Sequence, residues 1–273
     1  MMPWLSIITV VKDDPAGLAV TAASLSGGAA AADVEWIVCD GGADADAWGG
    51  TQATLAAIDT PVPIIDRAAD DGPYDGMNRG LERARGRYAL FLNAGDSLAA
   101  VDTLERVSDW LHYHPEADLA LFDALEIPAA GQAARYKPAR RPEQRLWGMP
   151  THHQAMIFRT DLIRALGGYG TAYRIAADYD LYLRAWRHRA QIERAGLPLC
   201  RFAPAGLSAR EAALGRREQV AIRRKVMGLD PLSNMVIGAA QGLALNLRQR
   251  LPGLYGRLRY AGHAERSGGG NAA

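Results

Sequence analysis

The chain has 273 residues, which is enough for one large α/β domain with a smaller appendage. Its 31 lysines and arginines nearly balance its 30 aspartates and glutamates, so the overall charge gives no reason to expect a nucleic-acid partner. The two cysteines, Cys39 and Cys200, exclude a disulfide scaffold and suit a reducing compartment. No stretch reaches the roughly 18–20 apolar residues of a membrane span, and the apolar N-terminus lacks the basic start and cleavage site of a signal peptide. We therefore expect a cytoplasmic protein.

The first part of the chain alternates predicted strands and helices. Residues 4–11 (WLSIITVV) are β-branched and apolar, which predicts a buried first strand. The elements expected next are a helix over 16–25, a strand over 34–39, a helix over 44–58 and a short strand that ends at Ile65. Strand–helix–strand units of this length predict a mainly parallel, doubly wound sheet with helices on both faces. The Gly-x-Gly-x-x-Gly fingerprint of dinucleotide-binding folds is absent from the sequence.

Residues 70–96 contain the densest pattern in the sequence, DDGPYDGMNRGLERARGRYALFLNAGD. Pro73 predicts a short helix that starts just after it, near Tyr74 or Asp75, and Gly86 is expected to close this helix. Residues 88–92 form an apolar run that is too short for a core helix and suits a buried parallel strand. The tetrapeptide Asn-Ala-Gly-Asp follows directly and ends at Asp96. Because open α/β sheets bind ligands at the carboxyl ends of their strands, we expect Asp96 at a metal or diphosphate centre.

The second part of the chain shows weaker patterns. Polar residues 132–145, with two prolines, predict an edge hairpin or a mobile loop. The other expected elements are a helix over 103–112, a strand over 117–127 near the sheet edge, a strand over 155–158, a helix over 161–166 ended by Gly167-Gly168, and a helix that opens near Asp178. Beyond Phe202 the composition changes, and residues 216–225 predict a basic helix.

Five motifs occur in one order and spacing that resembles the family 2 glycosyltransferases. They are SIITVVKDD at Ser6, VEWIVCDGG at Val34, the long motif at Asp70, THHQAMIFR at Thr151 and AADYDLYLR at Ala176. The similarity is closest to the colanic-acid and exopolysaccharide branch and covers roughly residues 4–210. It implies a GT-A fold, a nucleotide-diphosphate-sugar donor, a divalent cation (Mg²⁺ or Mn²⁺), and inverting transfer of a hexosyl-type sugar to a saccharide or lipid-linked saccharide in cell-surface polysaccharide biosynthesis.

The resemblance also implies which residues bind the donor. These are Thr9, Val11, Asp13, Asp40, Asp70, Asp75, Asn78, Asn93, Ala94 and Gly95. Asp40 matches the acid that accepts a hydrogen bond from the nucleobase edge. The alternative is that Asp40 belongs to an ordinary Asp-Gly turn. Asp75 belongs to the pattern that places polar groups at the ribose and diphosphate, and it can also cap a helix. Pro73 and Gly76 depart from the residues usual in that pattern, so the loop is expected to sit slightly differently.

Asp96 matches the metal-binding residue of the family. The general family motif has acids at its first and last positions, whereas this chain has Asn93 and Gly95 and keeps only the carboxylate of Asp96. One carboxylate, together with diphosphate oxygens and waters, can hold Mg²⁺ or Mn²⁺. The cation would neutralise the charge that builds on the departing nucleotide diphosphate. Because of this reduced motif, the alternative function of a protein that binds nucleotide-sugars without turnover stays open.

Asp178 matches the general base of the family. An inverting transfer needs a carboxylate that takes the proton of the acceptor hydroxyl as it attacks the anomeric carbon. The alternative interpretation makes Asp178 the N-cap of a helix beginning at Tyr179, and Asp180 is the alternative base. His153 and Gln154 match a pair on the acceptor side of the metal.

We divide the chain into a catalytic domain over 1–210, a helical extension over 211–262 and a disordered tail over 263–273. The extension combines arginines with apolar residues, namely Leu232, Met235, Val236, Leu243, Leu245 and Leu247. Such a segment could lie on an anionic inner membrane surface, which suits a lipid-linked acceptor. A helix packed against the catalytic domain explains the same pattern.

Overall fold

The computed structural model describes residues 2–26, 33–58, 61–128, 134–204 and 206–250. Within these ranges, the side chains of Leu207, Ala209 and residues 244–249 are left out of the description. The predicted tail over 263–273 and the end of the predicted extension lie outside the described residues.

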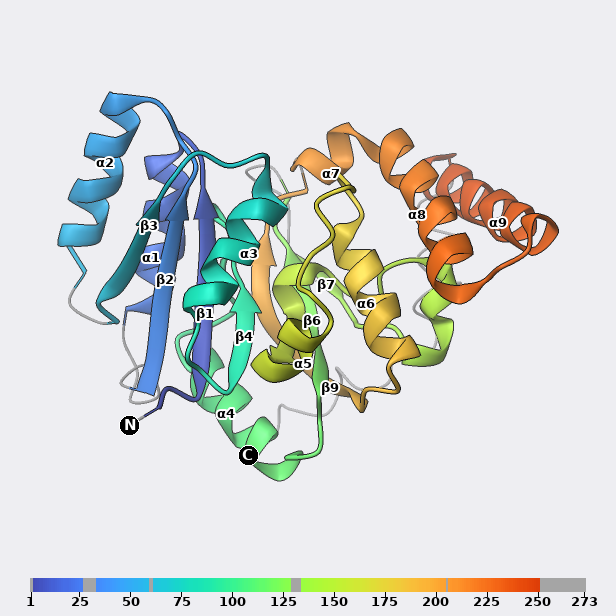
Figure 1. The fold of residues 1–273 in the computed structure, drawn as a ribbon, viewed down its shortest axis with the longest axis horizontal. Coiled ribbons are helices and arrows are strands. Elements are labelled where there is room, and N and C mark those ends of the chain that lie inside the picture. The colour runs from blue at the N-terminus through green and yellow to red at the C-terminus, as the bar shows by residue number, and fades with distance from the viewer. Residues whose placement is uncertain (1, 27–32, 59–60, 129–133, 205, 251–273) are drawn as a thin grey trace, which may run out of the picture.

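One mixed sheet forms the centre of the described molecule (Figure 1). Its strands are β1 (Leu5–Val11), β2 (Val34–Asp40), β3 (Pro63–Arg67), β4 (Tyr88–Phe91), β5 (Ser97–Leu98), β6 (Leu119–Glu126), β7 (Arg135–Lys137), β8 (Met156–Arg159) and β9 (Ile192–Phe202). The order across the sheet is β3-β2-β1-β4-β8-β6-β9-β5, with β7 paired to β6. The block β3-β2-β1-β4 is parallel, β8 runs antiparallel to both of its neighbours, and β6 and β9 are parallel. The predicted mainly parallel sheet is confirmed.

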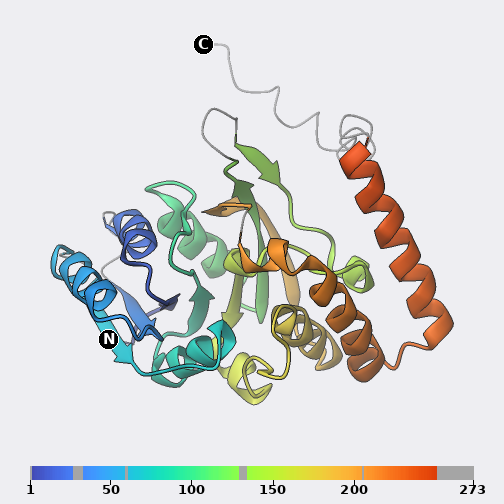
Figure 2. The ribbon, with the colours of Figure 1, turned by 90° about the horizontal axis from the view of Figure 1, so that it is seen from above.

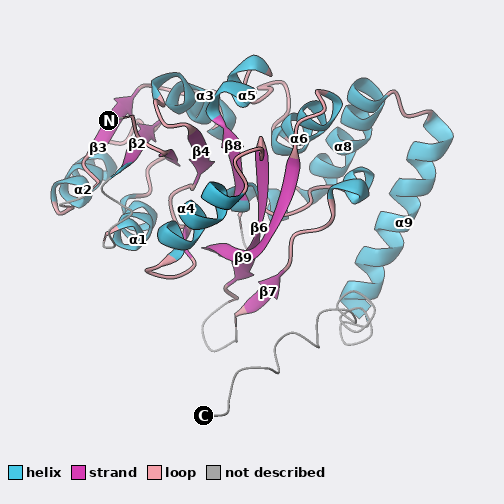
Figure 3. Ribbon diagram, turned by 90° about the horizontal axis from the view of Figure 1, so that it is seen from below, coloured by secondary structure: helices cyan, strands magenta, loops and turns pink. Residues whose placement is uncertain are grey.

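Helices cover both faces of the sheet (Figure 3). The α-helices are α1 (Pro15–Leu25), α2 (Ala45–Ala56), α3 (Pro73–Arg83), α4 (Thr103–Tyr113), α5 (Thr160–Ala165), α6 (Ala177–Arg187), α7 (Leu207–Arg210), α8 (Ala212–Met227) and α9 (Pro231–Arg250). The short 3₁₀ helices are η2 (Pro142–Trp147) and η3 (His153–Ala155). Helices α1, α2 and α4 lie on one face, and α3, α5 and α6 lie on the other (Figures 1 and 3).

Strand β1 explains why both faces are covered. All seven of its residues are buried. Because side chains of a strand alternate between faces, Ile8 and Val10 join the core beneath α3 and α6, whereas Ile7 and Val11 join the core beneath α1 and α4. A strand that is apolar on both faces needs helices on both sides, and this requirement gives the doubly wound arrangement.

The position predicted for the strand over 117–127 is wrong. It was expected near the sheet edge, but β6 lies inside the sheet between β8 and β9. Strand β9, which the sequence patterns did not indicate, covers the side of β6 that would otherwise be an edge. Gly196 has φ of +66° within β9, and the β6–β9 register shifts nearby. A strand with such an irregularity lacks the regular alternation by which strands are recognised in sequence.

The prediction that Gly86 closes the helix after Pro73 is also wrong. Helix α3 ends at Arg83, and Ala84 is its C-cap residue. A Cβ atom on Gly86 would lie 2.5 Å from the backbone nitrogen of Ser6. Gly86 is therefore required because its backbone passes against β1, where its N–H donates to Ser6 Oγ at 2.9 Å.

The C-terminal helices extend the molecule on the side of α6. Helix α8 packs against α6, and α9 packs against α8 and forms the outer edge of the fold (Figure 2). Within the segment predicted as an edge hairpin or a mobile loop, residues 135–137 form β7 and pair with β6, and η2 begins at Pro142. None of the described helices combines the length and apolarity needed to cross a bilayer.

Candidate active site

The turn after β4 is fixed by backbone contacts to β1 and α1. The N–H of Ala94 donates to the carbonyl of Val10 at 3.1 Å, and the N–H of Gly95 donates to the carbonyl of Gly17 at 2.9 Å. The hydroxyl of Thr21 donates to the carbonyl of Asp96 at 2.7 Å. Gly95 has φ of +90°, a conformation that favours glycine. These contacts hold the Asp96 carboxylate at the carboxyl end of the central strands.

Asp96 is buried and has a partner from the other half of the sheet. Gln154 Nε2 donates to Asp96 Oδ2 at 2.7 Å. Burial raises the pKa of Asp96 to about 6, and the hydrogen bond from Gln154 opposes that rise. The carboxylate is therefore partly desolvated but mostly ionised near neutral pH, as a cation-binding carboxylate must be.

His153 connects the β4 turn to the start of α6. Its Nε2 lies 3.0 Å from Asn93 Nδ2, and its Nδ1 lies 3.9 Å from Asp178 Oδ2. Burial lowers the pKa of His153 to about 3, so the ring is neutral at physiological pH and the contact with Asp178 is not an ion pair. Since the Asn93 amide nitrogen is a donor, Nε2 accepts and the ring proton is assigned to Nδ1, on the side of Asp178.

Asp178 is the second residue of α6, because the helix begins at Ala177 rather than at Tyr179. The interpretation of Asp178 as an N-cap is therefore wrong, and Ala176 is the N-cap residue. Burial raises the pKa of Asp178 to about 7, against the hydrogen bond that its carboxylate accepts from the N–H of Tyr179. A carboxylate with a pKa near neutrality is matched to general-base chemistry.

Two tyrosines complete the surroundings of Asp178. The rings of Tyr74 and Tyr169 stack with centroids 5.3 Å apart. Burial, and then the nearby charge of Asp178, raise the pKa of both phenols well above the usual value. The two rings thus restrict the water around Asp178 and sustain the desolvation that makes it basic.

Asp180, the alternative base, is committed to another role. Its Oδ2 accepts from Arg184 Nε at 2.7 Å, one helical turn along α6, and its side chain is buried. Arg184 also donates to the carbonyls of Gly168 and Leu166. Asp180 therefore anchors the connection between α5 and α6, and this geometry favours Asp178 as the base.

Three predicted donor-side carboxylates gather where β1, β2 and β3 end. The Asp40 carboxylate accepts from the N–H of Gly42 at 2.7 Å. A Cβ atom on Gly42 would lie 2.4 Å from Asp13 Oδ1, and one on Gly41 would lie 1.8 Å from Asp70 Oδ2. The glycine pair therefore lets Asp13, Asp40 and Asp70 approach one another at the sheet edge.

Other predicted donor-side residues use their side chains inside the fold. The Thr9 hydroxyl donates to the carbonyl of Leu92 at 2.7 Å and is fully buried. Val11 is buried in the core beneath α1. Both ends of the Asn78 side-chain amide bond the backbone of Tyr169, at 2.9 and 2.8 Å. Asp75 lies in the first turn of α3 and accepts from the N–H of Asp71 at 3.3 Å. The side chains of Thr9 and Asn78 therefore bond backbone groups within the fold.

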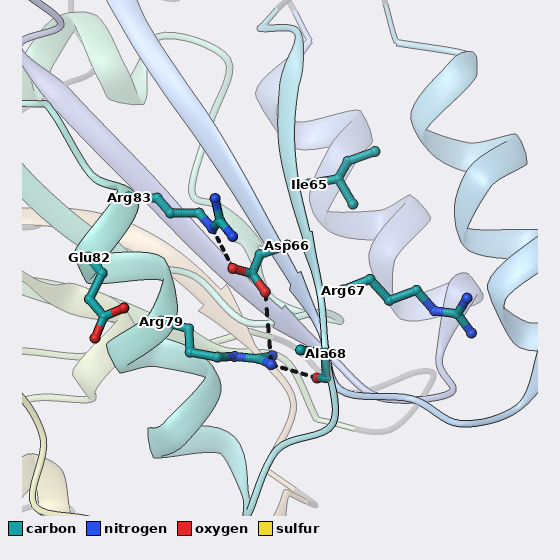
Figure 4. A pocket seen from close by; sticks show the side chains of 7 residues that line it. All are labelled: Ile65, Asp66, Arg67, Ala68, Arg79, Glu82 and Arg83. Atoms are coloured by element: carbon teal, nitrogen blue, oxygen red, sulfur yellow. Dashed lines mark hydrogen bonds and ion pairs between the residues drawn. The ribbon is translucent and has the colours of Figure 1, made fainter.

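An open groove of about 710 Å³ lies between β3 and α3 (Figure 4). Arg83 pairs with Asp66 across it, and Arg79 donates to the carbonyl of Ala68 at 2.6 Å. Arg79 also donates to the carbonyl of Ala69, at 3.2 Å. These contacts are internal and hold the loop that leads to Asp70, so the groove supports the site and does not form its centre.

The residues around Asp96 fit a cation that is shared with a donor molecule. Among the residues that the structure describes, no three His, Cys, Asp or Glu side chains gather as a metal-binding group. Asn93 Oδ1 and Gln154 Oε1, however, are buried oxygens without a hydrogen-bond partner among the described residues. Hard oxygens beside one carboxylate suit Mg²⁺ or Mn²⁺ completed by diphosphate oxygens, and they do not suit a closed protein cage.

Comparisons with known proteins agree with this fold. The chain is 33% identical, over 168 residues, to a PGL/p-HBAD biosynthesis glycosyltransferase of Mycobacterium bovis, a match that covers 59% of this chain and 62% of the relative. It is 28% identical over 184 residues to an uncharacterized glycosyltransferase of Mycobacterium tuberculosis, which covers 67% of this chain and 69% of the relative. The chain thus spans 62% of the length of the first of these relatives. No protein-family model matches the sequence.

Solved structures of low sequence identity share the architecture. Staphylococcus aureus TarS 1-349 in complex with UDP-GlcNAc has a TM-score of 0.64 and 15% identity, over 94% of this chain and 77% of that chain. The mannosyltransferase PcManGT of Pyrobaculum calidifontis, in complex with GDP-Man and Mn²⁺, has a TM-score of 0.66 and 16% identity, over 100% of this chain and 77% of that chain. The chain therefore has the GT-A fold, as predicted, and is similar in sequence to proteins named glycosyltransferases.

Proposed function

We propose that this protein is an inverting glycosyltransferase that moves a hexosyl-type sugar from a nucleotide-diphosphate-sugar to a saccharide or lipid-linked saccharide. The observation that carries the proposal is the bridge made by the adjacent residues His153 and Gln154. Gln154 bonds Asp96 at 2.7 Å, and His153 faces Asp178 at 3.9 Å. One short segment therefore joins the carboxylate expected at the diphosphate to the carboxylate expected at the acceptor.

Asp178 would act as the general base. The acceptor oxygen forms a bond to the anomeric carbon, the bond from that carbon to the diphosphate oxygen breaks, and the Asp178 carboxylate takes the hydroxyl proton. Attack from the face opposite the leaving group inverts the anomeric configuration. A pKa of about 7 leaves much of Asp178 ionised and still basic near neutral pH. Neutral His153 faces the same carboxylate at 3.9 Å.

Asp96 would hold the divalent cation, Mg²⁺ or Mn²⁺, which would neutralise the charge of the departing diphosphate. Asp13, Asp40 and Asp70 would contact the nucleoside, and Asn93, Ala94 and Gly95 would line the diphosphate. Val11 and Asp75 remain predicted donor-side positions. For Thr9 and Asn78, we propose an indirect role through the loops that their side chains hold.

The named relatives and structures support the substrate classes. The sequence relatives include a PGL/p-HBAD biosynthesis glycosyltransferase, and the structural neighbours were solved with UDP-GlcNAc and with GDP-Man and Mn²⁺. Exopolysaccharide biosynthesis at the cytoplasmic face of a membrane is the setting we propose, with residues 1–210 as the catalytic domain.

Helix α9 supports contact with an anionic bilayer. Leu232, Met235, Val236 and Leu243 are all more than half exposed, and their spacing places them on one face of the helix. The neighbouring helix α8 carries four exposed basic residues, Arg216, Arg217, Arg224 and Lys225, whereas the whole chain is nearly neutral. An exposed apolar face in a basic setting suits an anionic lipid surface.

The test is donor-dependent release of nucleoside diphosphate from a panel of UDP-, GDP- and dTDP-sugars with Mg²⁺ or Mn²⁺. We expect one donor to turn over, slowly with water and faster with an acceptor, and to require the metal. Binding without turnover, measured by calorimetry, would support the alternative of a non-catalytic nucleotide-sugar-binding protein, which the single carboxylate at Asp96 favours. The absence of both donor binding and donor turnover would overturn the proposal.

A further inference from the structure

Helix α8 supplies a carboxylate to the start of α6. Glu218 accepts hydrogen bonds from three successive backbone N–H groups, those of Arg174 at 2.8 Å, Ile175 at 2.9 Å and Ala176 at 2.8 Å. These residues directly precede α6, and its N-cap residue, Ala176, has no side-chain oxygen with which to cap the helix. Glu218 therefore caps the segment that enters α6, because it binds the N–H of the N-cap residue and those of the two residues before it.

The peptide group between Ile175 and Ala176 is also held from its other side. The carbonyl of Ile175 accepts from the hydroxyl of Tyr74 at 2.7 Å, while the N–H of Ala176 donates to Glu218 at 2.8 Å. Asp178 follows two residues after Ala176, in the first turn of the helix. A displacement of these capped residues would move the Asp178 carboxylate relative to His153 and the acceptor.

We propose that Glu218 is a positioning residue that holds Asp178 in its reactive place and thereby couples the C-terminal helices to the reaction. This inference rests on the proposed function of Asp178. Glu218 does not reach the reacting atoms, because its carboxylate oxygens are occupied by the three backbone N–H groups. The C-terminal extension is then part of the catalytic apparatus, and not only an appendage.

The charge of Glu218 also acts on Asp178. The groups that face Asp178 are the neutral ring of His153 on η3, the phenols of Tyr74 on α3 and Tyr169 after α5, and the carboxylate of Glu218 on α8. Glu218 is the negative charge of this set. Burial is the main cause of the raised pKa of Asp178, and the charge of Glu218 adds to it. Its neutralisation should therefore lower the pKa of Asp178 and weaken the base.

Glu218→Gln removes the charge of Glu218, and Glu218→Ala removes its hydrogen bonds as well. The matched control is Glu211→Gln. Glu211 is the N-cap residue of α8 and also contacts Arg174, but it accepts from the exposed side chain of that residue at 3.0 Å. In Glu218→Gln we expect the acid limb of the kcat profile to move to lower pH, with kcat reduced and the donor KM nearly unchanged. In Glu218→Ala we expect kcat to fall about tenfold or more.

Two results would overturn the inference. One is a kcat and pH profile in Glu218→Ala equal to those of the wild type. The other is an equal loss of kcat and folding stability in both variants while the pH profile stays fixed, which would make Glu218 a purely structural residue. Glu211→Gln should match the wild type in kcat, KM and pH profile, and an equal shift in this control would also contradict the inference.

Amide hydrogen exchange of the ligand-free protein tests the cap without any activity. In Glu218→Ala, the amides of residues 174–180 should exchange about tenfold faster than in the wild type, whereas Glu211→Gln should leave them unchanged. Should the wild type turn over no donor, the proposed function fails while this measurement still tests the cap. Unchanged exchange in Glu218→Ala would overturn the cap itself.

Discussion

Gln154 Nε2 donates a 2.7 Å hydrogen bond to Asp96 Oδ2, and this contact joins the turn after β4 to the segment before β8. The preceding residue, His153, faces Asp178 at the start of α6. Because η3 is a short 3₁₀ helix, its two adjacent side chains diverge and reach different carboxylates. The geometry of the proposed reaction thus depends on a segment that contributes neither of the two carboxylates.

Gln154→Leu should separate Asp96 from this segment without a large change in volume. The Asp96 carboxylate would lose a hydrogen bond that lowers its pKa, and it would hold a cation less well. We expect the metal concentration for half-maximal activity to rise about tenfold or more. Gln144→Leu, at an exposed position of η2, is the control and should leave the metal titration unchanged. Equal metal titrations for the wild type and Gln154→Leu would contradict this role.

Asp178→Asn should abolish activity and stabilise the fold. An aspartate in the unfolded chain has a pKa of about 3.9, whereas burial raises the pKa of Asp178 to about 7 in the folded state. The folded state therefore holds its proton more tightly, and the free energy of unfolding falls as the pH rises from about 4 to 7. At about pH 8 the Asn variant should gain roughly 1–3 kcal/mol over the wild type, since it has no charge to desolvate.

Thermal unfolding at about pH 8 and pH 4.5 measures this difference. The gain in Tm of Asp178→Asn should be large at the higher pH and should shrink at the lower one. Asp109→Asn, an exposed aspartate on α4, is the control and should change Tm little at either pH. A lower Tm for Asp178→Asn at the higher pH would show that Asp178 is a stabilising residue.

Gly86→Ala should destabilise the fold through backbone contact. The added Cβ atom would meet the Ser6 nitrogen at 2.5 Å, and main-chain atoms of a buried strand cannot move aside easily. We expect a loss of about 1–3 kcal/mol or more in urea unfolding. Gly49→Ala, in the exposed middle of α2 where nothing lies within 4 Å, should instead stabilise by roughly 0.5–1 kcal/mol. Equal effects of the two substitutions would contradict the close approach of Gly86 to β1.

Sedimentation with phosphatidylcholine vesicles, with and without phosphatidylserine, tests the apolar face of α9. The wild type should bind the anionic vesicles, and binding should weaken as salt is added. Replacing both Leu232 and Val236 with Glu should reduce binding about tenfold or more, whereas Ala213→Glu, exposed on α8, should reduce it less. Absence of vesicle binding together with self-association of the wild type would assign this face to a second copy of the chain.

The parts of the fold that sequence could predict are those with a local signal. The apolar run of β1 and the motif ending at Asp96 identified the parallel block and its carboxyl edge. Strand β9 escaped prediction because its irregular backbone breaks the alternation of buried residues. The interior position of β6 depended on that strand, so it could not be inferred from β6 alone.

The site could be predicted in type more than in detail. The resemblance gave Asp96 and Asp178 as candidates, but it could not show that Asn78 bonds Tyr169, 91 residues away. Glu218 was missed because an acid on a basic helix reads as a solvated residue. Its position among Arg216, Arg217 and Arg223 was the available signal, since a lone acid in such a helix suggests a specific partner. The partners of Glu218 are backbone N–H groups, and these do not depend on which side chains the sequence has at those positions.

The most direct test of the proposed reaction compares nucleoside diphosphate release by the wild type, Asp96→Ala and Asp178→Asn, with Asp109→Asn as the control. The donor is the sugar nucleotide that the wild type turns over, supplied with Mn²⁺ or Mg²⁺ and an acceptor. We predict that both site variants lose at least about 100-fold in kcat, while Asp109→Asn retains the rate of the wild type. Wild-type rates in Asp178→Asn would contradict the assignment of the base and, with it, the proposed mechanism.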